Sequence, residues 1–233
     1  MKLLISCEHA SAAVPDAYQG LFEGRNREIL WSHRGWDPGA LALARELSLF
    51  MEVPVFKGEW TRLLLDLNRS PDNPGRWSEF SRSLDVEERQ ALHQSIFAPY
   101  WDKLFGEVDS LILDSGRVIH LSIHSFVRIL NKKQRIVDVG ILFDPSRSME
   151  SELSTRLISN LTALGRDTLN IMKNAPYAGT EDGLTRLLRE KFPDSSYAGI
   201  EIEVCSDLLE DNKSIQKMAL NLSQTISQSI VNF

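Results

Sequence analysis

The chain has 233 residues, of which 42% are hydrophobic and 25% charged, with 26 Lys plus Arg against 32 Asp plus Glu and a formal net charge of −6. These values are typical of a globular protein with a substantial core, and they exclude disordered and fibrous classes. The acidic balance and the lack of a basic block speak against a nucleic-acid partner.

The lengths of the apolar segments and the number of cysteines predict where the protein is located in the cell. No apolar segment approaches the roughly 20 residues of a membrane span, so we expect a soluble protein with no membrane partner. Cys7 and Cys205 are the two cysteines, and neither belongs to a C-x-x-C pair. Because two cysteines are too few for a disulfide framework, we expect a reducing, cytoplasmic location.

The predicted elements alternate between strands and helices along the whole chain. Strands are expected over residues 3–7, 53–57, 118–123, 137–143 and 198–204, and helices over 39–51, 85–105 with Asp85 as its cap, 151–164, 180–192 and 212–231. This alternation predicts one α/β domain over residues 1–233, with a mostly parallel or mixed central sheet and helices on both faces. In such sheets ligands bind beyond the carboxyl ends of the strands, where we look for functional residues.

Histidines follow two of the predicted strands at that edge of the sheet. His9 comes just after the first strand, and His124 directly follows residues 118–123. Neutral imidazole and carboxylate are preferred ligands of catalytic zinc, although a lone histidine at a strand end is more often structural. His120 shares a strand face with His124, but His124 is nearer the carboxyl end and is favoured as a ligand. Asp37 either caps the helix that follows it or presents its carboxylate to the metal.

Two further clusters of charged residues each allow more than one functional interpretation. Arg62, Asn68 and Arg69 lie in one short segment, and guanidinium groups bind carboxylates in a bidentate manner, which suits an acidic substrate. Such arginines also form surface ion pairs that contribute little to stability. Glu201 and Glu203 share one face of a predicted strand, and their spacing alone does not choose between them.

Taken together and in this order, these clusters resemble the N-formylglutamate amidohydrolase family, whose fold and site are similar to those of zinc carboxypeptidases. The resemblance covers nearly the whole chain. It rests on the segments at residues 6–11, 14–15, 36–40, 43–44, 62, 66–69, 122–126, 138–145, 174–177 and 201–203.

The resemblance implies a fold similar to that of the zinc carboxypeptidases and one Zn²⁺ ion per chain. His9 and His124 would be two ligands, Asp37 the third, and His33 the alternative to Asp37. In a site of this kind, zinc polarises the amide carbonyl and lowers the pKa of a bound water.

The remaining site residues are assigned by the same resemblance. Glu203 matches the family glutamate that would act as general base. Arg62, Asn68 and Arg69 are similar to the carboxylate-binding group of the related peptidases. On chemical grounds Arg62 is also suited to stabilise the oxyanion of the tetrahedral intermediate. Val127 and Arg128 stand where many relatives have a small polar residue and proline, and we expect Arg128 to alter access of the substrate.

The expected function is zinc-dependent hydrolysis of the amide bond of a small acidic N-acyl amino acid, with N-formyl-L-glutamate as the first candidate, giving formate and L-glutamate. One alternative is a related metallo-amidohydrolase or carboxypeptidase-like enzyme that acts on another acyl amino acid or a short peptide. A different class is a non-catalytic small-molecule binding protein on the same scaffold. The sequence leaves the oligomeric state open, and a homo-oligomer is compatible with it.

Overall fold

A six-stranded sheet forms the centre of the computed structural model, which describes residues 1–165, 169–231 and 233. The strand order is β2-β1-β3-β8-β6-β7, and all neighbours are parallel except the pair β6 and β8. The sheet is therefore mixed. The strands are β1 (Lys2–Cys7), β2 (Val55–Lys57), β3 (Val118–Phe126), β6 (Val139–Leu142), β7 (Ile171–Lys173) and β8 (Tyr197–Cys205).

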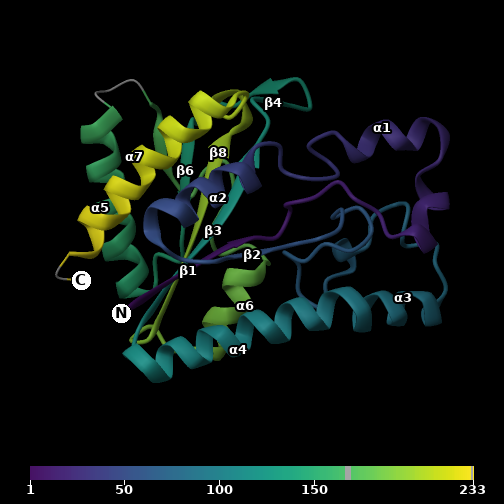
Figure 1. The fold of residues 1–233 in the computed structure, drawn as a ribbon, viewed down its shortest axis with the longest axis horizontal. Helices are drawn as coiled ribbons and strands as arrows, with labels where there is room; N and C mark the ends of the chain where they lie inside the picture. The colour runs from purple at the N-terminus through teal and green to yellow at the C-terminus, as the bar shows by residue number, and fades with distance from the viewer. Residues whose placement is uncertain (166–168, 232) are drawn as a thin grey trace.

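Helices cover both faces of this sheet, as predicted for the α/β class (Figure 1). One face packs against α2 (Ala40–Met51), α5 (Ser148–Gly165) and α7 (Asn212–Ile230). The other face packs against α4 (Ala98–Ser115) and α6 (Leu184–Lys191). The short helices α1 (Arg27–Leu30) and α3 (Val86–Leu92) lie to one side of the sheet (Figure 1).

The two faces of the sheet differ in chemistry. Successive side chains of a strand point to opposite faces, so residues two apart share a face. On β3, Ile119, Leu121 and Ile123 join the core beneath α2, α5 and α7. The alternate residues His120 and His124 are buried on the opposite face, where polar residues follow the apolar start of the strand. The sheet therefore buries a polar stripe that leads to the carboxyl ends of its strands.

The predicted helix over residues 85–105 is longer and is interrupted. Asp85 forms the expected cap, because its Oδ1 accepts a hydrogen bond from the Glu88 amide at 2.8 Å and the Glu88 carboxylate accepts one from the Asp85 amide. The chain then passes through a π-helical segment, His93–Phe97, and continues as α4 to Ser115. Gly116, with φ of 77°, ends α4 in the left-handed conformation that glycine adopts readily.

Other boundaries also differ from prediction. The helix expected over residues 180–192 starts only at Leu184, and the strand expected to end at residue 123 continues to Phe126 and includes His124. The sequence patterns did not predict β7 or the two-stranded hairpin of β4 (Ile129–Leu130) and β5 (Lys133–Gln134). Strands of two or three residues are too short to show a period in the sequence.

Candidate active site

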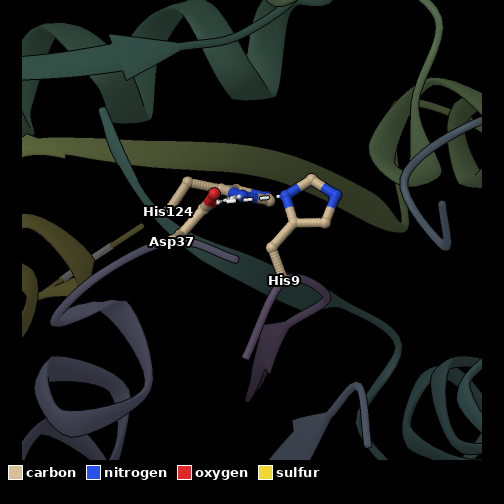
Figure 2. A group of neighbouring side chains, drawn as sticks. All are labelled: His9, Asp37 and His124. Carbon is tan, nitrogen blue, oxygen red and sulfur yellow. Dashed lines mark hydrogen bonds and ion pairs between the residues drawn. The ribbon is translucent and has the colours of Figure 1, made fainter. Parts of the chain in front are cut away.

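His9, Asp37 and His124 meet near the carboxyl ends of β1 and β3 (Figure 2). One ligand atom from each residue lies within 4.8 Å of the other two, and all three side chains are buried. His9 follows β1, His124 belongs to β3, and Asp37 lies in the loop before α2. Strand pairing between β1 and β3 thus brings together two histidines that are far apart in sequence.

The Asp37 carboxylate is the centre of this group. Its Oδ2 atom lies 2.8 Å from Nδ1 of His124 and 3.3 Å from Nδ1 of His9. Asp37 does not use its side chain to cap α2, because the residue at the helix start is Gly39 and the carboxylate turns toward the histidines. Of the two interpretations open from the sequence, the structure therefore shows the one in which Asp37 faces the site.

The outer nitrogen of each imidazole is also held by a carboxylate. Nε2 of His9 lies 2.7 Å from Oδ1 of Asp66, and Nε2 of His124 lies 3.0 Å from Oε2 of Glu8. Ser122 Oγ is a further neighbour of His124 Nε2, at 2.9 Å. A carboxylate on the far nitrogen fixes the ring orientation and tautomer of a metal-binding histidine. Both imidazoles are thus oriented with Nδ1 toward the interior of the site.

This donor set fits a zinc ion. Two imidazole nitrogens and a carboxylate oxygen converge from three segments, which is the ligand number of a catalytic zinc site that keeps a position for water. His9, Asp37 and His124 would hold the ion, and Asp66 and Glu8 would orient the two histidines. His33 lines the same pocket but does not belong to the group of three.

The charges in the site stabilise one another strongly in the metal-free protein. Although burial opposes the charged form, hydrogen bonds to Asp37 and Glu8 raise the pKa of His124 well above its ordinary value. Burial likewise opposes ionisation of Asp37, yet the two histidines hold the pKa of its carboxyl far below the usual range. Asp66 behaves in the same way, since Arg62 and His9 outweigh the burial effect and lower its pKa. The site therefore favours a cation among its carboxylates.

Arg62 lies next to this group. Its Nη1 is 3.1 Å from Nδ1 of His9 and 3.5 Å from Oδ1 of Asp37, and its Nη2 donates to Oδ2 of Asp66 at 2.9 Å. The side chain is one quarter exposed, so its head group reaches the pocket while its partners are buried. A guanidinium in this position can stabilise negative charge that develops on a substrate oxygen.

Glu203 lies beside His124 because β3 and β8 pair in register at these two residues. Its Oε2 atom is buried and has no hydrogen-bond partner among the described residues. Burial raises the pKa of this carboxyl to about 7. Glu201, on the same face of β8, instead accepts a hydrogen bond from Thr185 Oγ1. Of these two glutamates, Glu203 is the one with a buried, unpartnered oxygen in the pocket.

Asn68 and Arg69 line another part of the pocket. Oδ1 of Asn68 accepts a hydrogen bond from the Leu184 amide at the start of α6, at 2.7 Å, which leaves the amide NH₂ of Asn68 as a donor. Arg69 Nη1 donates to the carbonyl of Asp182 at 2.7 Å and to that of Asn68 at 3.0 Å. The α6 terminus thus fixes both side chains at the pocket wall.

Two residues singled out from the sequence lie outside the pocket lining. His120 is buried below it, between Ser6 Oγ at 2.7 Å and Tyr197 Oη at 2.8 Å, and burial lowers its pKa to about 4. His120 therefore supports the site from below and does not line the pocket. Arg128 forms ion pairs with Asp138 and Asp207 instead of facing the pocket.

The sequence patterns alone did not identify four residues that the structure places at the site. Asp66 and Glu8 lie in segments that resemble the family, but their type and spacing alone assign neither of them a role. Tyr177 lies in another of those segments and lines the pocket. Arg135 also lines it, yet in the sequence this residue stands in a basic segment that is typical of a solvated loop.

The buried His/Asp/His group could hold a metal ion, and the unpartnered carboxylate beside it is suited to proton transfer, so the site has the components of a hydrolase. The sequence matches the family described as N-formylglutamate amidohydrolase over residues 1–209. The chain belongs to this family, and the resemblance inferred from its motifs is confirmed. It is therefore an amidohydrolase of the N-formylglutamate amidohydrolase type.

Solved structures share this fold. The gene product Atu2144 from Agrobacterium tumefaciens is 31% identical, with a TM-score of 0.83 over 98% of this chain and 90% of that one. An N-formylglutamate amidohydrolase from Ralstonia eutropha JMP134 is 18% identical, with a TM-score of 0.75 over 97% of this chain and 92% of that one. A comparison with curated proteins gave no match. Within the part of the chain that the structure describes, no helix has the length and apolar character needed to cross a bilayer.

Proposed function

We propose that this chain hydrolyses the amide bond of a small acidic N-acyl amino acid and uses one zinc ion held by His9, Asp37 and His124. The first candidate substrate is N-formyl-L-glutamate, with formate and L-glutamate as products. The observation that carries this proposal is the buried, unpartnered Oε2 of Glu203 in the pocket that also contains the three donor residues. A buried carboxylate without a partner is costly unless a ligand or reacting water uses it.

Glu203 is proposed to act as general base and then as general acid. It takes a proton from the attacking water and delivers this proton to the leaving amine nitrogen as the C–N bond breaks. A carboxyl whose pKa is about 7 is suited to both steps near neutral pH, because it exchanges its proton readily in either direction. The ion, when bound, would acidify the water and polarise the carbonyl.

The guanidinium and amide groups of the pocket are proposed to hold the substrate. Arg62 stabilises the oxyanion of the tetrahedral intermediate, because its head group lies beside the metal-ligating atoms and is fixed by Asp66. Asn68 and Arg69 bind a carboxylate of the substrate through donors that the α6 terminus has already oriented. Together these three side chains would orient the substrate amide for attack by water.

The test combines metal analysis with the release of formate. Protein purified without chelator is expected to hold about one zinc per chain and to release formate from N-formyl-L-glutamate. Glu203→Gln should lower kcat by about 10²-fold to 10⁴-fold while the zinc content stays unchanged. Replacement of Glu201 by Gln provides the matched control on the same strand face, and it should cost far less.

Two results would contradict the proposal. The first is a protein that holds no stoichiometric zinc and stays inactive when zinc is added. The second is a Glu203→Gln variant that hydrolyses the substrate at the wild-type rate. Comparison of formyl, acetyl and peptide amides of glutamate then identifies the acyl group, because each releases a different carboxylic acid or amino acid.

A further inference from the structure

The β4–β5 hairpin brings a cation to the active-site pocket. Ile129 pairs with Gln134 and Leu130 with Lys133, and the two residues between the strands, Asn131 and Lys132, have φ of 51° and 63°. Two successive left-handed residues form the tight turn that fits the twist of a two-stranded hairpin. Leu130 and Arg135, from the two sides of this hairpin, both line the pocket.

Arg135 is held by aromatic rings instead of carboxylates. Its guanidinium carbon lies 4.9 Å from the centre of the Tyr177 ring and 5.4 Å from that of Phe126. Its Nη2 atom also donates to Tyr177 Oη at 3.0 Å. No ion pair among the described residues includes Arg135, whereas Arg62 contacts both Asp37 and Asp66. Arg135 is thus a pocket cation that forms no ion pair with a carboxylate of the described residues.

The base of the hairpin is fixed by Arg128. This side chain contacts Oδ1 of Asp138 at 2.7 Å and Oδ2 of Asp207 at 3.2 Å, and it donates to the Val137 carbonyl at 2.9 Å. The Arg135 amide donates in turn to the Arg128 carbonyl at 2.8 Å. Because the hairpin is braced in this way, less conformational entropy is lost when Arg135 binds a ligand.

We infer that Arg135 is a specificity-determining residue that binds the side-chain carboxylate of an acylated dicarboxylic amino acid. The inference rests on the proposed function. Such a substrate carries two carboxylates, and Asn68 with Arg69 accounts for one of them. Besides the N–H group that Tyr177 uses, Nη1 of Arg135 donates to the Val127 carbonyl at 3.5 Å. The remaining N–H groups of the guanidinium lie in the same plane and can bind a carboxylate. The hydroxyl of Tyr177, which contacts Arg135, lies next to the same position.

The test measures binding in a protein that does not turn over its ligand. Zinc-loaded Glu203→Gln protein is titrated by calorimetry with N-formyl-L-glutamate and with N-formyl-L-glutamine, an isostere whose side chain is uncharged. We expect binding of the glutamate derivative to be at least about tenfold tighter, as is typical of one charge-assisted pair. Adding Arg135→Gln should reduce this preference to less than about threefold, through loss of affinity for the glutamate derivative alone.

A second charge change on the same hairpin serves as the control. Lys133 is exposed and does not line the pocket, so Lys133→Gln should leave the preference unchanged. The inference is overturned if Arg135→Gln weakens both ligands equally, if it weakens neither, or if the protein with Arg135 does not distinguish the two ligands. Hydrolysis by the wild type is scored separately. If the wild type cleaves formyl amides but shows no preference for the glutamate derivative, the proposed function holds and the inference about Arg135 fails. If the protein binds with this preference but cleaves neither ligand, the proposed function fails and the inference about binding holds.

Discussion

The imidazole of His9 lies between two carboxylates, with Nδ1 3.3 Å from Asp37 and Nε2 2.7 Å from Asp66. The ring therefore has one nitrogen toward the proposed metal position and one fixed by a neighbour outside it. Figure 2 shows the inner side of this arrangement, with the His9 ring directed toward Asp37 and His124.

Asp66→Asn should lower zinc affinity by about 10-fold to 100-fold, because the ring of His9 loses the charge that orients it and makes it a stronger ligand. Competition with a chromophoric chelator measures this affinity directly. Asp72→Asn, an exposed change a few residues later in the chain, is the control and should leave zinc binding unaltered. Equal zinc affinity of the Asp66→Asn variant and the wild type would argue against this role of Asp66.

Glu203→Gln should stabilise the metal-free protein at alkaline pH. Burial raises the folded-state pKa of this carboxyl from an ordinary value of 4.5 to about 7. Both folded and unfolded chains are protonated below pH 4.5, so the carboxyl costs nothing there. As the pH rises from 4.5 to 7, the Glu203 carboxyl loses its proton in the unfolded chain before it does so in the folded chain. Above pH 7 the buried charge therefore lowers the free energy of unfolding by at most about 3 kcal/mol.

Urea unfolding in the presence of EDTA, at pH 4.5 and at pH 8, measures this difference. The gain in the free energy of unfolding for Glu203→Gln over the wild type should appear at pH 8 and be small at pH 4.5. A gain of the same size at both values would show that ionisation of Glu203 is not its cause.

Gly39→Ala should destabilise the protein and disturb the site. Gly39 has φ of 82°, and a Cβ atom built there would lie 2.5 Å from Cβ of Leu209. Left-handed strain and this overlap together should cost about 1–3 kcal/mol, and the loop that carries Asp37 should shift. Gly106→Ala is the matched control, because Gly106 lies within α4 with open space around it and should gain about 0.5–1 kcal/mol. Thermal unfolding and zinc content distinguish the two variants.

Asp194 ties the start of α5 to the loop before β8, and its contribution should depend on pH. Its Oδ2 accepts hydrogen bonds from the amide of Ser148 at 2.8 Å and from its hydroxyl at 2.6 Å, and Oδ1 accepts from the Met149 amide at 3.2 Å. Although burial acts in the opposite direction, these hydrogen bonds lower the pKa of the carboxyl.

A carboxyl with a lowered folded-state pKa stabilises the protein above the ordinary pKa of Asp, and this contribution is lost as the pH falls through the folded-state pKa. Asp194→Ala should therefore cost about 1 kcal/mol at neutral pH, as for loss of a helix cap, and less in acid. Chemical unfolding across pH 2.5–7 measures this. A cost that stays constant over that interval would rule out the charged form as its source.

The sequence determined the class of fold and the set of candidate residues. Short apolar runs rich in strand-forming residues specified β1, β3 and β8. The two-residue period of a strand placed His120 and His124 on one face. The rule that ligands gather at the carboxyl ends of strands then favoured His124, which the structure places with His9 and Asp37.

The tertiary structure decided which of these residues meet. The spacing along β8 did not distinguish Glu201 from Glu203 as the candidate base. In the structure Glu201 accepts a hydrogen bond from Thr185 of α6, whereas a buried oxygen of Glu203 has no partner among the described residues. The direction of the Asp37 side chain, the pairing of Asp66 with His9 and the approach of Arg135 to the pocket are likewise contacts between distant segments. Local sequence patterns report periodicity within one element. The position of a side chain relative to another element depends on strand register and loop packing, which arise only when the whole chain folds.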